Sequence, residues 1–99
     1  MRHTQTLFVE SEHGLHARPA AELVQVANAY QADIMFSGNG MSANARSIMS
    51  LLMLGAARGT ELTVTADGAD AIDALLAIRQ TGQLSGTNTQ QWDSPESTP

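Results

Sequence analysis

An imidazole and a guanidinium lie at a predicted helix start in the run GLHARPAA, residues 14–21. Pro19 favours the first helical turn because its missing N–H would have no intrahelical partner there, so the helix begins near His16. The first N–H groups of a helix are unpaired, and the macrodipole adds partial positive charge. An anion beside the imidazole would therefore meet backbone donors at Ala17 and Arg18. The spacing predicts a histidine nucleophile next to an anion-binding helix end.

The Arg18 side chain adds a fixed positive charge with fork-shaped donors close to this helix end. A nearby cation and a helix start disfavour a second positive charge on the His16 ring, which favours the neutral, nucleophilic imidazole. The same positive field would stabilise a phosphoryl group, whose charge spreads over its equatorial oxygens during in-line transfer. This arrangement suits phosphoryl chemistry, and an ordinary surface histidine is the alternative at this point.

A metal site is not expected, although His13 lies three residues before His16. No cysteine or nearby pair of carboxylates completes a ligand set, and His3 belongs to another predicted element. A serine hydrolase is not expected either, because the chain has no G-x-S-x-G or comparable nucleophile turn. Nothing in the sequence calls for a cofactor.

The composition limits the class of protein. The chain has 99 residues, which fits one small domain, and its lack of cysteine fits a reducing compartment. Ten acidic side chains stand against five basic ones, so a nucleic-acid-binding surface is not expected. No segment is long and apolar enough to cross a bilayer, and the N-terminus lacks the apolar core of a signal peptide. We expect a cytoplasmic protein, without membrane insertion, whose partners are proteins or small molecules.

Hydrophobic periodicity and turn signals predict four strands and three helices. In chain order these are a strand at 3–10, a helix at 17–30, strands at 32–37 and from residue 41, a short apolar helix at 48–54, a strand at 60–66 and a helix at 69–80. The Gly38-Asn39-Gly40 turn joins the second and third strands in a hairpin. The order βαββαβα predicts an α+β fold with helices on one face of a mostly antiparallel sheet.

After Gly82 the composition changes to Ser, Thr, Gln, Asn and Pro, with one Trp and almost no aliphatic residues. Such a segment cannot bury enough apolar surface to stay ordered alone. We therefore expect a folded domain at residues 1–82 and a polar, disordered tail at residues 83–99, with Trp92 in a solvated environment.

Two blocks of the chain resemble the HPr family, the histidine-containing phosphocarriers of the phosphoenolpyruvate-dependent sugar phosphotransferase system. They are GLHARPAAELV around His16 and SIMSLLMLGAARGTELTVTADGADA from Ser47, and the resemblance runs from about residue 3 to residue 82. It implies an open-faced β-sandwich, with a four-stranded antiparallel sheet and three helices on one side. It also implies a carrier and not an enzyme, a monomer that accepts a phosphoryl group on His16, at Nδ1 in the family.

The resemblance also names partners. Enzyme I would donate the phosphoryl group and sugar-specific IIA components would accept it. Two alternatives stay open: a nitrogen-related or dihydroxyacetone-kinase relay with the same chemistry, and a regulatory binding module that docks on transcription factors or enzymes. Family members devoted to regulation can lack the histidine, so His16 argues against a module that is never phosphorylated.

The short apolar helix at 48–54 is too apolar to be buried on every side. Part of its surface should be exposed beside His16, and Met side chains suit a surface that meets several partners. By resemblance the docking residues on this helix are Ile48, Met49 and Leu52. Ala17 and Ala21 join them from the first helix, and Ala21 is small enough to let a partner approach.

Two further residues have readings of their own. Ser47 has the composition of a helix N-cap. By resemblance it is also a regulatory phosphorylation site, which in some family members serves an ATP-dependent HPr kinase/phosphatase. His13 departs from the family, which more often has Asn or Ser there, so this departure bears on the ordering of the loop around His16.

Overall fold

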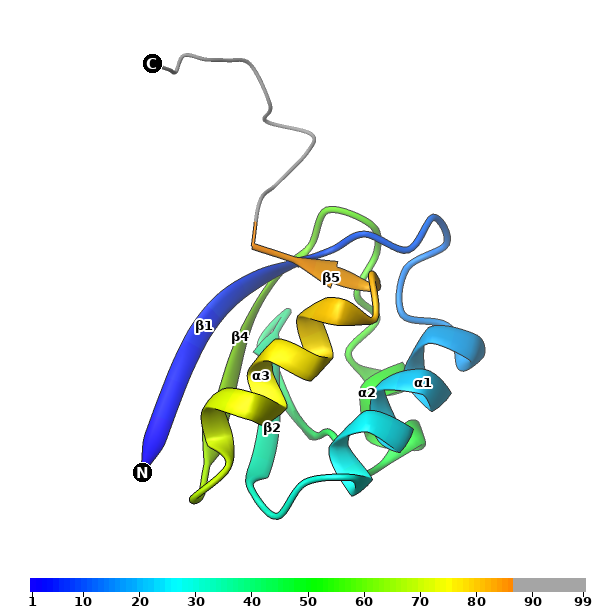
Figure 1. The fold of residues 1–99 in the computed structure, drawn as a ribbon. Helices are drawn as coiled ribbons and strands as arrows, with labels where there is room; N and C mark the ends of the chain where they lie inside the picture. The colour runs from blue at the N-terminus through cyan, green and yellow to red at the C-terminus, as the bar shows by residue number, and fades with distance from the viewer. Residues whose placement is uncertain (87–99) are drawn as a thin grey trace.

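The computed structural model describes residues 1–86 and shows an α+β fold (Figure 1). The elements in chain order are β1 (Arg2–Val9), α1 (Ala17–Asn28), β2 (Asp33–Gly38), β3 (Met41–Asn44), α2 (Ile48–Met53), β4 (Glu61–Asp67), α3 (Ala71–Gln80) and β5 (Leu84–Ser85). The predicted order of strands and helices is confirmed up to α3. In the described part of the chain no helix is long and apolar enough to cross a membrane.

One antiparallel sheet carries the fold, with strand order β3-β2-β4-β1-β5. All three helices cover the same face of it (Figure 1). In β4 the apolar Leu62, Val64 and Ala66 are buried under the helices and alternate with more exposed polar residues, as the sequence pattern predicts. The hairpin between β2 and β3 turns at Asn39 and Gly40, which both have positive φ, as a tight two-residue turn requires.

The core lies between the sheet and the helices. Its largest fully buried side chains come from both layers: Phe36, Leu7, Leu23, Leu51, Leu62, Ile78, Leu84, Val9 and Val64. No polar or charged residue is buried among those described. The core therefore holds the layers together by apolar contact, and ionisable groups lie at the surface where chemistry can use them.

The sheet has a fifth strand that the sequence did not predict. Leu84 pairs with Val9 and Ser85 with Phe8, and Leu84 is only 1% exposed. The Glu10 N–H also donates to the Gln83 carbonyl at 2.8 Å. The expected boundary at residue 82 is therefore too early, because one leucine in a polar run supplies enough apolar contact to fix residues 83–86. The rest of the expected tail, including Trp92, lies outside the described residues.

Arg46 closes the C-terminal end of α1. Its guanidinium donates to the carbonyls of Tyr30 at 2.6 Å and Ala32 at 3.2 Å, and it lies 3.4 Å from the Asp33 carboxylate. The last turn of α1 has no basic residue of its own. A side chain from the loop before α2 thus supplies the cation that favours the negative end of the helix dipole.

Asp70 ties the same connection to α3. Although it stands at the N-cap of α3, its carboxylate accepts from the N–H groups of Gln31 and Ala32, both at 2.9 Å. The hydrogen bond from Gln31 is the main reason that the pKa of Asp70 is lowered, and it outweighs the opposing effect of desolvation. The segment between α1 and β2 is therefore held from two directions, by Arg46 and by Asp70.

Replacing Leu84 tests whether β5 belongs to the domain. Leu84→Ala should lower the free energy of unfolding by about 2–5 kcal/mol, the usual range for a buried Leu-to-Ala change. Leu76→Ala is the matched control, because Leu76 is 48% exposed, and it should cost less than about 1 kcal/mol. Urea denaturation measures both, and equal stability of the two variants would contradict the assignment.

The Asp70 hydrogen bonds predict a pH-dependent stability. A folded-state pKa below the ordinary 3.8 means that the contribution is fully present above that value and is lost as the pH falls through the folded pKa. Asp70→Asn should therefore be less stable than the parent at neutral pH, and this gap should close in acid. Urea unfolding over a pH series measures the gap, and Asp73→Asn in the same helix is the control. A gap that is constant with pH would refute the prediction.

Candidate functional site

The N-terminus of α1 is open to an incoming anion. His16 is its N-cap residue, with extended backbone, and the His16 carbonyl accepts from the Ala20 N–H at 3.0 Å. The imidazole makes no capping hydrogen bond, and no acidic residue lies in the first turn. The N–H groups of Ala17 and Arg18 thus have no intrahelical acceptor, and the ring itself is exposed.

Backbone contacts hold the loop that presents His16. Gly14 has φ +75°, and a Cβ there would clash with the carbonyl oxygen of Ala56. The same carbonyl accepts from the Leu15 N–H at 2.9 Å, and Leu15 is buried. Ser11 closes the turn by donating its hydroxyl to the Gly14 carbonyl at 2.9 Å. His16 is therefore positioned by the chain around it, which leaves its ring free to react.

An open pocket of about 370 Å³ lies at His16, between the β1–α1 loop and the chain that follows α2. Its lining residues are His13, Leu15, His16, Leu52, Gly55, Ala56 and Ala57. The His13 ring stands nearly edge-on to the His16 ring, with centroids 6.0 Å apart. The unusual residue of the loop thus borders the space that a group bound to His16 would enter.

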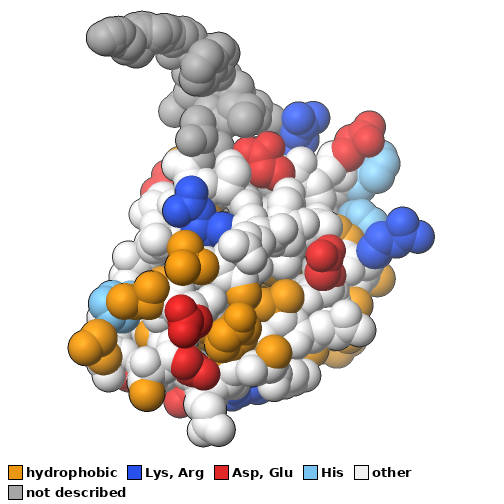
Figure 2. All heavy atoms as spheres, viewed as in Figure 1, with side chains coloured by type: hydrophobic (Ala, Val, Ile, Leu, Met, Phe, Trp, Pro, Cys, Tyr) orange, Lys and Arg blue, Asp and Glu red, His pale blue; other side chains and the backbone are white. Residues whose placement is uncertain are grey.

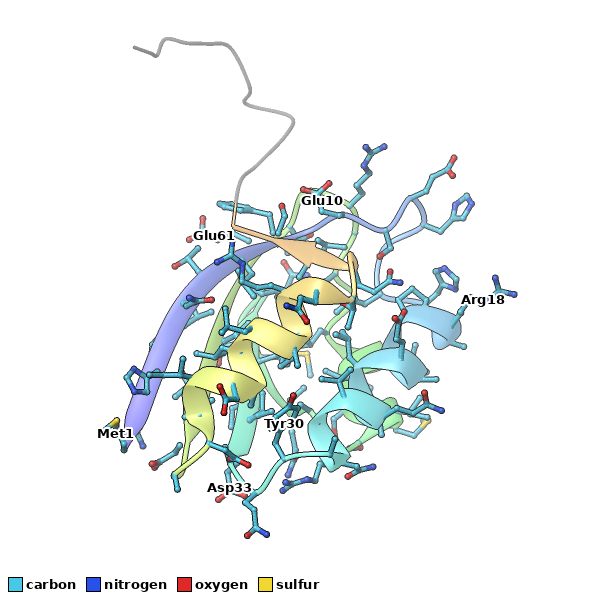
Figure 3. The ribbon with its side chains drawn as sticks, viewed as in Figure 1. Met1, Glu10, Arg18, Tyr30, Asp33 and Glu61 are labelled. Atoms are coloured by element: carbon cyan, nitrogen blue, oxygen red, sulfur yellow. The ribbon has the colours of Figure 1, made fainter. Side chains whose placement is uncertain are left out.

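Arg18 is exposed at the start of α1 and points away from the rest of the fold (Figure 3). Within residues 1–86 it takes part in no salt bridge, so its guanidinium has no competing carboxylate. Pro19 and Ala20 are buried and anchor the first turn, whereas Ala17 is exposed and Ala21 is half-buried. The structure thus brings a cation, free N–H groups and an imidazole to one helix end.

The helix α2 packs beside α1 and presents apolar side chains to solvent. Leu51 is its buried anchor, while Met49 is 67% exposed and Ile48 and Met53 are also exposed. We call Ile48, Met49 and Met53 the α2 patch. Leu52 is half-buried and lines the His16 pocket, so it connects the patch to the imidazole.

Ser47 caps α2 as its sequence position predicts. Its side chain accepts from the Ser50 N–H at 3.1 Å, and its carbonyl accepts from the Leu51 N–H. The hydroxyl therefore lies at the start of the helix that carries the α2 patch.

Sequence reasoning missed the far wall of the pocket. Gly55, Ala56 and Ala57 are some forty positions away from His16 along the chain and carry no reactive group, so only the glycine gave a signal, as a helix end. Met53 was not predicted among the docking residues, although it lies next to Leu52. Among the described residues no group of three or more His, Cys, Asp or Glu side chains could hold a metal ion.

Comparison with known proteins identifies the family. The family model for the PTS HPr component phosphorylation site matches residues 3–82. The crystal structure of phosphocarrier protein HPr from Bacillus anthracis str. Ames is 40% identical, with a TM-score of 0.74 over 78% of this chain and 92% of that one. A Mycoplasma histidine-containing phosphocarrier protein is 37% identical, with a TM-score of 0.75 over 80% of this chain and 90% of that one.

A second kind of relative also matches. Crh, the Bacillus subtilis catabolite repression HPr, is 39% identical in a crystal structure described as a swapped dimer, with a TM-score of 0.61 over 73% of this chain and 87% of that one. Family model and structures agree on nearly the whole described chain. This protein belongs to the HPr family of the phosphotransferase system.

Proposed function

We propose that this protein is a cytoplasmic phosphocarrier that accepts a phosphoryl group from enzyme I on His16 and passes it to sugar-specific IIA components. The observation that carries the proposal is an exposed imidazole at the open N-terminus of α1. The family is one of phosphocarriers, and the described residues place nothing over this ring that would bar a partner.

The transfer follows from the geometry. A nitrogen of His16 attacks the phosphorus in line, the new N–P bond forms, and the bond to the donor breaks with its electron pair leaving on the donor. The N–H groups of Ala17 and Arg18 and the Arg18 guanidinium face the equatorial oxygens, where charge accumulates. The second transfer is the same step in reverse order, so the protein returns unchanged. It acts as a protein substrate of the enzymes on either side.

Partner docking would use the surface beside the imidazole. Ile48 and Met49 of the α2 patch and Leu52 supply apolar area, and Ala17 and Ala21 leave room for close approach. One partner after another must bring its own phosphorylation site to the same ring. Flexible Met side chains fit such reuse of a single surface.

Ser47 is proposed as a regulatory phosphorylation site for a kinase/phosphatase of the HPr type. A phosphate there would lie at a helix N-terminus, where the dipole and free N–H groups favour negative charge, so the helix should persist. Its charge would instead act on partners, next to the docking residues Ile48 and Met49.

The similarity to Crh supports one second candidate, a regulatory binding module. The same similarity leaves open whether this protein is a monomer, as we propose, because dimers occur among the matched structures. A nitrogen-related or dihydroxyacetone-kinase relay would keep the chemistry at His16 and change only the partners. Phosphorylation of His16 separates both carriers from the regulatory module.

Replacing His16 or Arg18 tests the proposed transfer. With phosphoenolpyruvate and enzyme I, His16→Ala should give no acid-labile label, whereas Arg18→Ala should keep the label and slow its formation by about a hundredfold. Intact mass and rapid-quench kinetics measure these effects. Arg79→Ala, on α3, is the matched control and should react at the parent rate. Unchanged labelling of His16→Ala would refute the site.

Replacing Ser47 tests the regulatory proposal. Ser47→Asp should keep the native circular dichroism and thermal stability, because aspartate is itself a good N-cap. By resemblance enzyme I brings an acidic docking surface, so the added charge should slow phosphorylation of His16 by about tenfold or more, or ~1.4 kcal/mol.

The control for this prediction is Ser47→Ala, which removes the cap without adding charge. It should lose about 1 kcal/mol of stability and keep the parent phosphorylation rate. If the folded Ser47→Asp protein reacts at full rate, the electrostatic account fails and Ser47 is only a helix cap.

A further inference from the structure

The outer edge of β1 is only partly covered. On one side β1 pairs with β4 from Arg2 to Phe8, but on the other it pairs with β5 only at Phe8 and Val9. The Val9 N–H points to the β4 side, at the Thr60 carbonyl, whereas the Glu10 N–H points to Gln83. Backbone groups alternate along a strand, so those of Thr4 and Thr6 face the uncovered side. Within residues 1–86 no strand pairs with this stretch.

A pocket of about 130 Å³ lies along the same stretch of edge, lined by His3, Thr4, Gln5, Ile72, Leu75 and Leu76. Two polar atoms are buried without a hydrogen-bond partner, the His3 Nε2 and the Gln5 Oε1. Buried polar atoms are nearly always paired in folded proteins, so two orphans beside one pocket point to a missing partner.

Exposed apolar side chains surround this pocket. Ile72 is 53% exposed, Leu76 is 48% exposed, and Met1 stands at the end of β1. Hydrophobic side chains gather over α3 and the N-terminal end of β1 in the space-filling view (Figure 2). An open strand edge next to such a patch is an aggregation hazard that proteins usually cover.

The register of β5 shows which part of the chain would cover it. β5 runs antiparallel to β1, with Leu84 opposite Val9 and Ser85 opposite Phe8, so the chain leaves β5 heading toward the uncovered stretch. Continued in register, the residues that follow fall opposite the start of β1: Thr87 opposite Thr6, Asn88 opposite Gln5, Thr89 opposite Thr4, Gln90 opposite His3 and Trp92 opposite Met1.

Side chains alternate along the extended strand. Leu84 faces the helices, so Asn88, Gln90 and Trp92 would face them too. The Asn88 amide would donate to the Gln5 Oε1, and the Gln90 amide would pair with the His3 Nε2. The indole of Trp92 would reach the apolar patch around Ile72. Each unpartnered group of the edge thus meets a side chain of complementary chemistry.

We propose that residues 87–92 continue β5 along β1, with Trp92 as the anchor on α3. The segment contains two threonines, which favour strands, and no proline before Pro95. Its first charged residue, Asp93, would arrive beside the positive N-terminus of the chain. The polar segment cannot fold alone, and the edge of β1 supplies the backbone partners and apolar surface that it lacks.

Amide hydrogen exchange of the full chain tests this pairing. The N–H groups of Thr4 and Thr6 should be protected, although the described residues leave them without acceptors. Thr89→Pro removes a ladder N–H in the middle of the segment, so both amides should lose their protection. Ser94→Pro, beyond Trp92, is the matched control and should change neither. Leu7 should stay protected in every variant, because its N–H faces β4.

Trp92 gives a second readout, because it is the only tryptophan in the chain. Its emission should be blue-shifted in the parent, and Thr89→Pro should shift it to the red. Unprotected Thr4 and Thr6 in the parent would overturn the proposal, as would protection that survives Thr89→Pro. Protection that rises with protein concentration would also overturn it, since the occupant would then be a second copy. None of these readouts depends on phosphorylation of His16.

Discussion

The close approach of Gly14 to the Ala56 carbonyl determines the geometry of the site. That one carbonyl accepts from Leu15 and leaves no room for a side chain at residue 14, so two distant loops are fixed against each other by backbone alone. The helix start, the His16 pocket and the neighbouring α2 patch all depend on this contact. Because no side chain of the site is spent on positioning, the imidazole, the N–H groups and Arg18 all stay available to a ligand.

The three helix starts of the fold are used in three ways. Ser47 caps α2 with its own hydroxyl, which makes that start self-sufficient. Asp70 turns away from α3 and binds the segment before β2. His16 caps nothing, and α1 alone is left with free donors beside a reactive ring. Stability thus comes from two helix starts, and the third is left for chemistry.

The sequence was sufficient for the features that rest on local pattern. The alternation in β4, the turn at Asn39 and Gly40, and the cap at Ser47 follow from neighbouring residues, and the structure has them all. It was insufficient where partners are far apart in the chain. Nothing near Asp70 indicates that it binds Gln31, and Ala56 gives no sign that it borders His16. β5 was missed because a single leucine cannot raise the mean hydropathy of a long polar segment.

The surface of the fold separates two kinds of interaction. The α2 patch and the His16 pocket share one region, so a partner that binds the patch also reaches the imidazole. The free edge of β1 and the exposed face of α3 form another, with their own apolar residues and their own unpaired polar atoms. A strand that covers this second region would occupy none of the donors at the start of α1. Protection of the sheet edge and phosphoryl transfer therefore make no competing demands on the same residues.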